Sequence, residues 1–431
     1  MAEVDLLVFR EVRVMKSRQR SAAAVLAITT AGSVSSGQTF QGLGTVTGTA
    51  YSYGSAVSGN GTAAAGESHT FAAFSHAFRW TNSGGLEDLA TLGGVSAIGT
   101  GISADGTAVA GYSTTSNGSY HAFRWTPGTG MVDLGPLPTG GSQTYGNSIS
   151  ADGLSVAGYG YTPGGLAHAF HWHLVNGMQD LGLITGATES KALAISGDGS
   201  VVVGVSIGPG GDRAFRWTAQ LGMVSLGTLP NGTTSQAAAV SADGFVVVGT
   251  ASTPAVDHAF RWTSSGGMQD LGVVPGRTSS RGYAVSANGL VIAGESDHHA
   301  FIWMSGVGMM DLNTYLPALG INLNGWTLTS ANGLSADGAA IVGTGTHNGS
   351  DEAWVVRLGQ VCFANCDAST TPPVVNVGDF TCFLQQYSAA LQLPSGQQVS
   401  HYANCDGSTT PPTVNVGDFT CFLQKYAAGC L

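Results

Sequence analysis

The chain has 431 residues, of which 65 are glycine and only 10% are charged, and its formal net charge is −11. This charge excludes binding to nucleic acid or to an anionic membrane through a basic surface. Abundant glycine with few Lys and Glu residues favours many short strands joined by turns over long helices. A hydrophobic fraction of 43% excludes a disordered chain.

The N-terminal segment has the pattern of an export signal. A basic stretch, Met15–Arg20, precedes a short apolar core, Ala22–Thr30, and small residues then offer a cleavage site before residue 38. The core is too short to span a bilayer and no other segment is apolar enough, so no membrane span is predicted. Acidic residues before Met15 suit a signal peptide poorly, which favours Met15 as the true start. We therefore expect residues 1–37 to be a signal peptide, and the protein to be secreted or held at the cell surface.

Three motifs recur along residues 38–358. Ser-x-Asp/Asn-Gly occurs at Ser58, Ser103, Ser150, Ser196, Ser241, Ser286 and Ser335, with gaps of 45 to 49 residues. His-Ala-Phe-Arg-Trp and its variants begin at His76, His121, His168, Arg213, His258, His299 and Glu352. Gly-Met-x-Asp-Leu-Gly and its variants occur around Asp88, Asp133, Asp180, Ser225, Asp270 and Asp311. Self-similarity at this period is typical of a repeat architecture.

Each repeat contains four short runs that resemble β-strands, as in Ser235–Ser241, Phe245–Gly249, His258–Thr263 and Gly267–Gly272. The Asp-Gly and Gly-Gly links between them suit hairpins, because glycine tolerates positive φ. Four strands at this period predict one propeller blade. The last repeat lacks its fourth run, but Phe40–Gly44 resembles that run ahead of the first repeat. We therefore predict an all-β, seven-bladed propeller of four-stranded blades, closed without a free edge by this N-terminal strand.

The residues of these motifs resemble those of the bacterial extracellular HAF-repeat family over roughly residues 40–358. The resemblance implies a propeller-like fold on an exported protein and no particular activity. The repeated residues are interpreted as scaffold, since a side chain present in nearly every blade meets a need of every blade. Arg79 and its equivalents are expected to lie over the Trp rings or to pair with the repeated Asp.

The tight turns are expected on one face of the propeller, and the longer links on the other. Binding residues concentrate on variable loops, so the second face is the predicted binding face. The ligand-binding residues predicted there are Tyr112, Tyr159, Tyr161, Arg277, Arg281, Glu295 and Trp326. Tyrosines with scattered polar groups suit a sugar or peptide surface, and ordinary solvated loops are the alternative.

The sequence contains little that indicates catalysis. It has no Gly-x-Ser-x-Gly, His-Glu-x-x-His or phosphate-binding loop motif. A glycosidase needs two facing carboxylates, and a lyase needs a base. The carboxylates that would have to converge from different blades are Glu67, Glu189, Glu295 and Asp351.

Residues 359–431 form a tandem repeat in which residues 365–387 and 404–426 match at 20 of 23 positions. Each copy ends in apolar residues at i, i+3, i+4 and i+7, which predicts a helix. All six cysteines lie here, and in an exported protein this predicts a disulfide framework. Among the possible pairings, the duplication favours Cys366–Cys382, Cys405–Cys421 and Cys362–Cys430.

This tandem repeat resembles a dockerin, in particular the dockerin-type domains ending in Gly-Cys on planctomycete exported proteins. The resemblance implies a small α-helical, EF-hand-like domain that binds calcium and docks to a cohesin-like or other cell-surface protein. The implied calcium ligands are Asp367, Ser369, Thr371, Asn376 and Asp379, and in the second copy Asp406, Ser408, Thr410, Asn415 and Asp418. Both loops carry Thr-Pro-Pro where dockerins have Asp-Gly, so a metal-free, disulfide-stabilised helical pair is the alternative.

Together these features predict an exported, non-catalytic binding or display protein. Its propeller would recognise a glycan or a protein, and its C-terminal module would attach it to a surface or partner. The alternative is an extracellular carbohydrate-active enzyme, either a hydrolase or a lyase, tethered by the same module. A purely structural envelope component is the third hypothesis.

Overall fold

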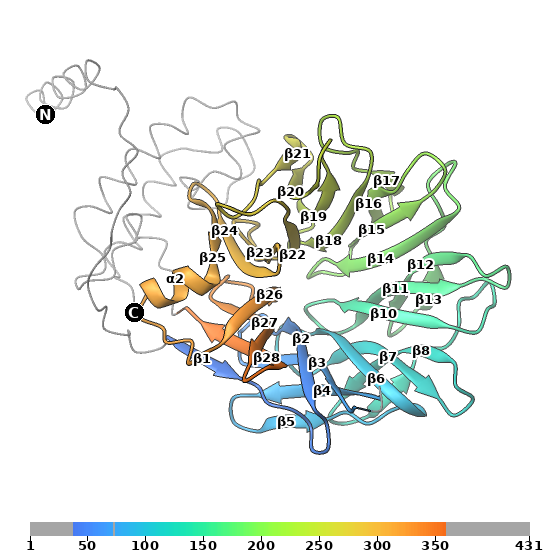
Figure 1. The fold of residues 1–431 in the computed structure, drawn as a ribbon. Helices are drawn as coiled ribbons and strands as arrows, with labels where there is room; N and C mark the ends of the chain where they lie inside the picture. Colours follow the sequence, from blue (N-terminus) through green and yellow to red (C-terminus); the bar gives the residue numbers. More distant parts are fainter. Residues whose placement is uncertain (1–37, 72–73, 359–431) are drawn as a thin grey trace, which may run out of the picture. The chain divides into compact units, whose positions relative to one another are not determined.

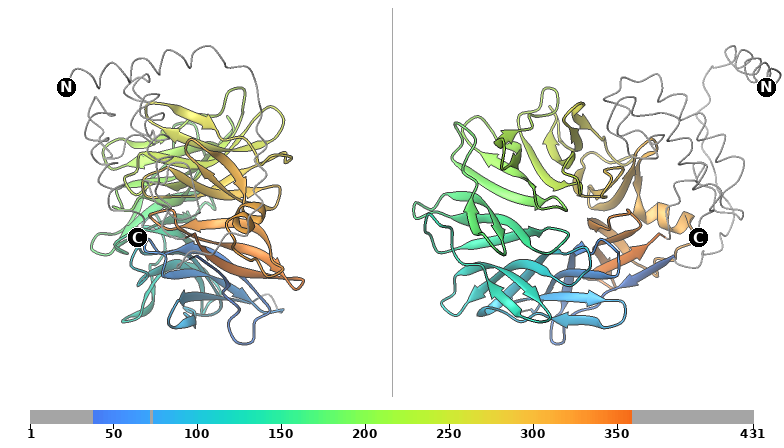
Figure 2. Two further views of the ribbon diagram at one scale, coloured as in Figure 1. Left: turned by 90° about the vertical axis from the view of Figure 1, so that its left-hand side faces the viewer. Right: turned by 180° about the vertical axis from the view of Figure 1, so that it is seen from behind.

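The computed structural model describes residues 38–71 and 74–358. The predicted signal peptide and the predicted C-terminal module, with its calcium ligands and disulfides, lie outside the described residues. The described residues form seven four-stranded antiparallel sheets. These sheets are the blades of a ring around a central channel (Figure 1, and from two further directions in Figure 2). The prediction of an all-β, seven-bladed propeller is confirmed.

The blades follow one another along the chain. Blade 1 consists of β2 (Tyr51–Val57), β3 (Ala63–His69), β4 (Ser75–Thr81) and β5 (Gly85–Asp88), and blade 2 of β6 (Gly93–Ile102), β7 (Val109–Thr115), β8 (Tyr120–Thr126) and β9 (Gly130–Asp133). Blade 3 consists of β10 (Thr144–Ile149), β11 (Ser155–Tyr161), β12 (Ala167–His173) and β13 (Gly177–Asp180), and blade 4 of β14 (Glu189–Ile195), β15 (Val201–Ile207), β16 (Arg213–Thr218) and β17 (Gly222–Ser225).

Blade 5 consists of β18 (Ser235–Val240), β19 (Val246–Ser252), β20 (Asp257–Thr263) and β21 (Gly267–Asp270), and blade 6 of β22 (Arg281–Val285), β23 (Val291–Ser296), β24 (His299–Met304) and β25 (Gly308–Asp311). A short helix, α2 (Leu312–Ala318), follows β25. Blade 7 combines β26 (Thr327–Leu334), β27 (Ala340–His347) and β28 (Ser350–Arg357) with β1 (Thr39–Gly42) from the N-terminal side.

Burial follows the order of the strands within a blade. The first strands line the channel, which has a volume of about 190 Å³. Its lining residues include Ser55, Asn147 and Tyr283. The second strands are the most buried, and in β15 every residue except Ile207 is buried. The fourth strands contain no buried residue, and β21 is mostly exposed. The Asp-Leu-Gly strand is therefore outermost, as the sequence predicts.

The Ser-x-Asp/Asn-Gly motif forms the turn between the first and second strands of every blade. In blade 2 the Ser103 hydroxyl donates to Asp105 Oδ1 at 2.6 Å and accepts from the Ala108 amide at 2.9 Å. The same two bonds occur in the other six blades. The bond from Ser103 holds the pKa of Asp105 below its usual range. Gly106 has a φ of 75°, which glycine adopts without strain.

These turns also join one blade to the next. The Ala104 amide donates to the carbonyl of Ala151, and the Ala151 amide donates to that of Gly197, both at 2.9 Å. The Ala336 amide donates to the carbonyl of Gly59 at 3.0 Å, which connects the last blade to the first. A buried backbone group needs such a partner, so the contact between turns satisfies polar groups at these joints.

The repeated arginine makes a second contact across the joint. Arg79 Nε donates to the carbonyl of Gly106, in the turn of the next blade, at 2.6 Å. Its guanidinium carbon lies 6.0 Å from the centre of the Trp125 ring, also in the next blade. The expected position of the arginine near a tryptophan is therefore found, with the tryptophan coming from the neighbouring blade.

The repeated Asp pairs with the repeated His, so the expected pairing with arginine is wrong. His76 Nδ1 lies 2.8 Å from Asp88 Oδ2, and equivalent pairs occur in blades 2, 3, 5 and 6. The strand register explains the choice, since Asp88 lies opposite Phe78. His76 and Phe78 share one face of the strand, whereas Arg79 points to the other.

The phenylalanine of the His-Ala-Phe motif forms the core of blades 1 to 6. Phe78, Phe123, Phe170, Phe215, Phe260 and Phe301 are all fully buried. Each faces a repeated glycine of the second strand, as Phe170 faces Gly158. A Cβ at Gly158 would lie 1.9 Å from the carbonyl oxygen of Tyr145 and 2.8 Å from the Phe170 ring. Only glycine fits between this ring and the first strand.

The ring closes through the pairing of β1 with β28, which places Phe40 opposite Val356. Figure 1 shows β1, in blue, beside the orange β28. The Phe40 ring packs against Trp326 and Trp354, with centroid separations of 5.5 and 6.2 Å. Closure by an N-terminal strand is thus confirmed.

Blade 7 replaces the His–Asp pair with a single glutamate. Glu352 stands at the histidine position, and its Oε1 accepts from the Gly44 amide at 3.0 Å. Gly42 stands at the aspartate position. A Cβ there would lie 2.6 Å from Trp326 Cζ2 and 2.8 Å from Glu352 Oε1. The closing strand therefore needs glycine at this position.

We expect Gly42→Ala to lower the free energy of unfolding by about 1–3 kcal/mol, because the added methyl group overpacks the closure. Urea denaturation followed by tryptophan fluorescence measures this loss. Gly128→Ala is the control, since a Cβ at Gly128 meets no heavy atom within 4 Å. Equal stability of the two variants would contradict the importance of this contact.

Candidate functional site

The propeller has two unlike faces. The turn face carries the Ser-x-Asp/Asn-Gly turns and the turns between third and fourth strands. The loop face carries the links between second and third strands and the links between blades. Loop-face links range from the two residues 297–298 to the long connection 312–326. Such variation on a rigid scaffold is typical of a binding face.

One cross-strand pair near the loop face changes from blade to blade. It joins the residue after the repeated glycine of the second strand to the residue opposite it in the first strand. The seven pairs are Tyr53–Glu67, Ile98–Tyr112, Tyr145–Tyr159, Lys191–Val205, Gln236–Thr250, Arg281–Glu295 and Ser330–Thr344. We call these the variable pairs. Because the glycine beside each pair repeats and the pair does not, the scaffold does not dictate its chemistry.

Five tyrosines from blades 2 and 3 meet at and beside these positions. This tyrosine cluster consists of Tyr112, Tyr120, Tyr145, Tyr159 and Tyr161. Tyr145 is at its centre and stacks on Tyr159, with ring centroids 5.0 Å apart and an interplanar angle of 14°. It also contacts Tyr112 edge-to-face at 5.0 Å across the joint between the blades. Every ring of the cluster is half-buried.

A lysine borders the tyrosine cluster on blade 4. Lys191 Nζ lies 5.2 Å from the centre of the Tyr159 ring, at cation–π distance. The Tyr145 hydroxyl donates to Gln143 Oε1 at 2.7 Å, which orients its ring. The cluster therefore offers aromatic surface with polar groups at its edge.

Burial controls the ionisation of these phenols. It raises the pKa of Tyr145 to about 12, with further contributions from the neighbouring tyrosines. It also raises the pKa of Tyr112 and of Tyr159 above the ordinary value. The phenols therefore stay protonated at neutral pH, and the hydroxyls of Tyr112 and Tyr159 can donate hydrogen bonds to a ligand.

Blade 1 adds a second aromatic group next to the cluster. Tyr51 stacks on His69, with centroids 5.0 Å apart and an interplanar angle of 8°. His69 Nε2 lies 2.9 Å from Glu67 Oε2. Burial raises the pKa of Glu67, although His69 opposes the rise. The charge of Glu67 contributes to the raised pKa of Tyr112, so this group adjoins the tyrosine cluster.

Two of the four carboxylates considered for catalysis approach a common residue. The Tyr53 hydroxyl lies 3.5 Å from Asp351 Oδ2, and Tyr53 is directly opposite Glu67. Burial raises the pKa of Tyr53, and both carboxylates add to the rise. Glu189 lies in β14 of blade 4, and Glu295 lies in β23 of blade 6.

The predicted residues of blade 6 form a separate polar group. Arg281 Nη1 pairs with Glu295 Oε1 at 2.9 Å. Arg277 Nη2 lies 2.6 Å from His299 Nε2. Burial raises the pKa of Tyr283 to about 12, with a contribution from Glu295. The sequence analysis missed Tyr283. Its position two residues after Arg281 in the same strand could have indicated it, because residues i and i+2 lie on one face of a strand.

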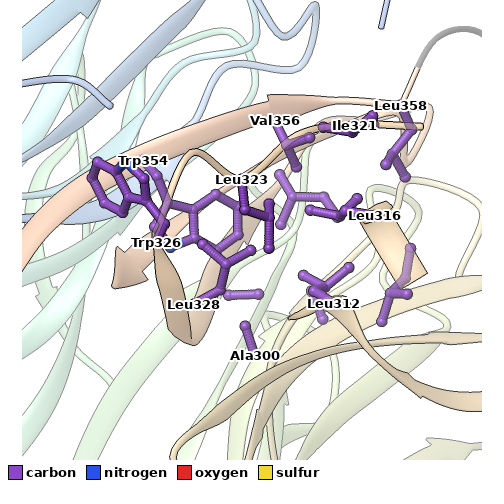
Figure 3. Packing of buried hydrophobic residues seen from close by; sticks show 14 of the residues in the cluster. Ala300, Leu312, Leu316, Ile321, Leu323, Trp326, Leu328, Trp354, Val356 and Leu358 are labelled. Carbon is purple, nitrogen blue, oxygen red and sulfur yellow. The ribbon is translucent and has the colours of Figure 1, made fainter. Parts of the chain in front are cut away.

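Trp326 lies in the hydrophobic core and not on the loop face. Its side chain is 8% exposed, and its ring stacks on His347 with centroids 4.6 Å apart. Figure 3 shows it beside Trp354, Leu323 and Leu328 in the packing of blade 7. The structure therefore brings Tyr112, Tyr159 and Tyr161 together and separates Trp326 from them.

The candidate residues come mostly from strands, although the sequence placed them in loops. Tyr112 lies in β7, Tyr159 and Tyr161 lie in β11, and Glu295 lies in β23. Each second strand has buried valines or alanines near the turn face, and its last residues lie near the loop face. Backbone pairing within the blade therefore holds these side chains in place.

Residues 38–71 and 74–358 contain neither a metal-binding cluster nor a membrane-spanning helix. No group of three or more His, Cys, Asp or Glu side chains in these ranges is placed to hold a metal ion. No helix in the same ranges is long and apolar enough to cross a membrane.

No family model and no curated protein matches the chain. Among solved structures, oligogalacturonate lyase from Vibrio parahaemolyticus aligns with a TM-score of 0.51 at 10% identity, over 76% of this chain and 98% of that one. An oligogalacturonate lyase in complex with manganese gives 0.49 at 11% identity, over 75% and 97%. TolB from Acinetobacter baumannii gives 0.38 at 12% identity over 72% of this chain, which spans 63% of the TolB chain. The likeness to the Vibrio enzyme shows the propeller fold alone.

The loop face also contains a carboxylate whose contribution to stability depends on pH. Asp297 accepts from the amide and hydroxyl of Ser279, at 3.1 and 2.6 Å, and from the Thr278 amide at 2.6 Å. These bonds, led by that of the Ser279 hydroxyl, lower the pKa of Asp297 to about 2. Its stabilising effect is therefore complete above the unfolded pKa and lost as the pH falls toward 2.

We expect Asp297→Asn to melt below the wild type at pH 6 and the difference to shrink between pH 4 and pH 2. Melting temperatures across this range measure it. Asp212→Asn is the control, because no described residue donates a hydrogen bond to the Asp212 carboxylate, so the variant should change little. A difference that is constant with pH would contradict the role given to Asp297.

Proposed function

We propose that the protein is an exported, non-catalytic binding protein that recognises a glycan through the tyrosine cluster of its loop face. The observation that carries this proposal is the convergence of Tyr112, Tyr145 and Tyr159 from two blades at variable pairs. A repeat scaffold needs no tyrosine at this position, since blade 5 has Gln236 and Thr250 there. The side chains therefore serve a purpose beyond folding.

The chemistry of the cluster supports a sugar ligand. Aromatic rings offer apolar faces for stacking on pyranose rings, and edge groups orient the hydroxyls. Lys191 and the protonated phenols provide donors, while Glu67 provides an acceptor. Because the rings pack on one another, little side-chain entropy is lost when a ligand binds.

A second candidate function, an extracellular carbohydrate-active enzyme, rests on Glu67. A buried carboxyl with a raised pKa is a candidate general acid, and Asp351 approaches the same Tyr53. Against this role, Glu67 is in contact with His69. The propeller fold does not choose between the two functions, because one fold hosts many activities.

The C-terminal module completes the proposal. Its resemblance to a dockerin supports attachment to a cohesin-like or other cell-surface protein, with calcium held by the two loops. Export is supported by the pattern of residues 1–37 and by the cluster of cysteines.

A panel of immobilised glycans, probed with the full chain, tests the binding function. We expect Tyr159→Ala to raise the dissociation constant for the bound glycan at least about tenfold, because a stacked aromatic ring is lost. Leu221→Ala is the control, since Leu221 is 67% exposed on the turn face. Equal weakening by both variants, or no glycan bound at all, would refute the proposal.

The enzyme alternative is decided by incubating the full chain with the same glycans and measuring new reducing ends or unsaturated products. A binding protein produces neither. Release of products that is abolished by Glu67→Gln, with glycan binding retained, would replace the binding function with catalysis.

Calcium binding is expected to depend on the first loop residue of each copy. Titration calorimetry of the chelator-treated full chain should show calcium binding that Asp367→Ala combined with Asp406→Ala abolishes, because each change removes a carboxylate ligand. Asp212→Ala, which removes a charge from the propeller, should leave it unchanged. No calcium heat in the wild type would support the metal-free alternative.

A further inference from the structure

On the turn face, the joints between blades differ in the side chain that fills them. In blades 1, 2, 4 and 5 an arginine bridges to the turn of the next blade. Arg79, Arg124, Arg216 and Arg261 donate from Nε to the carbonyls of Gly106, Gly153, Gly244 and Gly289, at 2.6, 2.6, 3.0 and 3.2 Å. A guanidinium group thus fills each of these four joints.

Blade 3 has His171 at this position, where blade 6 has Ile302. Ile302 is fully buried and fills its joint with apolar atoms. Histidine is shorter than arginine, and a cavity of about 760 Å³ opens beside His171 between blades 3 and 4. Its walls include Asp198, Gly199, Trp217, Asp243 and Phe245. We call this cavity the blade 3–4 cavity.

The blade 3–4 cavity keeps the two groups that Arg79 contacts in the first joint, a turn carbonyl and a tryptophan ring. Gly199 is the turn glycine that corresponds to Gly106, and no arginine stands opposite its carbonyl. Trp217 corresponds to Trp125, which lies under Arg79 in the first joint. His171 takes part of that place, with its ring centroid 6.0 Å from that of Trp217.

His171 itself has an unused polar atom. Its Nε2 is buried and has no hydrogen-bond partner among the described residues. Burial lowers the pKa of His171, so the ring is neutral at pH 7 and one of its nitrogens is an acceptor. With the ring proton on Nδ1, Nε2 is the acceptor, and a buried acceptor without a partner carries a desolvation penalty that a bound donor would relieve.

The charge of the walls favours a cation. Asp198 and Asp243 contribute two carboxylates, Arg216 contributes one guanidinium and His173 contributes an imidazole. Arg216 Nε donates to Gly244, and its charge interacts with Asp198. The Asp198 carboxylate accepts from Ser196 and Ser200 within its turn. Since carboxylates have several lone pairs, it can still accept from a ligand.

From these observations we propose that the blade 3–4 cavity binds a ligand with a guanidinium or amidinium group, which takes the place that the arginine side chain has in the other joints. The planar cation would donate to the Gly199 carbonyl and the Asp198 carboxylate and lie against Trp217. The volume falls in the range of about 300–1,000 Å³ typical of small-molecule sites, so it holds the rest of the ligand as well. This site is on the turn face and is independent of the tyrosine cluster.

The experiment uses the full chain with methylguanidinium, agmatine and a short arginine-containing peptide as probes. Each guanidinium probe should raise the melting temperature of the wild type saturably, by about 2 °C or more at a concentration well above its dissociation constant. Methylurea has a similar planar shape without the charge, and it should have no effect. Tighter binding of the peptide than of agmatine would identify a protein arginine as the ligand, and the reverse order would identify a free small molecule.

Two variants of one residue provide the matched comparison. His171→Arg restores the guanidinium of the other joints, so it should melt higher than the wild type and lose the response to all probes. His171→Ala leaves Gly199, Asp198 and Trp217 in place, and it should still respond. No saturable response of the wild type, or an equal response of His171→Arg, would overturn the proposal. Tyr159→Ala should respond as the wild type does, which separates this site from the glycan site.

Discussion

The pairing of β1 with β28 is the constraint on which the rest of the propeller depends. Seven sheets arranged in a ring leave one joint to be closed by residues from opposite ends of the domain, and an unpaired edge there would expose backbone donors and acceptors. The closure is built from Phe40 packed on two tryptophans and from Gly42 fitted against Trp326. Every blade is then held between two neighbours.

Inside this ring the repeated residues perform one task per blade. The serine of each turn donates to the Asp or Asn of the motif and accepts from a backbone amide, and each His–Asp pair fixes an outer strand to its neighbour. The scaffold is thereby satisfied by residues that recur. Positions that do not recur, such as the variable pairs, are free to carry binding chemistry at the loop face.

Departures from the repeat are informative on both faces. On the loop face, tyrosines of adjacent blades meet because the variable pairs of blades 2 and 3 both carry them. On the turn face, a single exchange of arginine for His171 leaves a cavity whose walls remain those of an arginine site. In each case the function is proposed where the repeat is broken, because the unbroken positions are already explained by folding.

The number of blades, their four strands and the closing strand could be predicted from the sequence, because these depend on motifs that repeat within one blade and on the missing seventh copy of a strand. The scaffold role of the repeated residues was also predictable, but not their partners. The sequence left Arg79 either over a Trp ring or paired with the repeated Asp, and the strand register gives that Asp to His76. Contacts between blades were beyond the sequence, since Tyr112 and Tyr145, like His171 and Gly199, are distant in the chain. Only the tertiary structure decided that the first pair touch, that Trp326 is buried, and that a cavity opens beside His171, because side-chain contacts across a joint depend on how two blades pack.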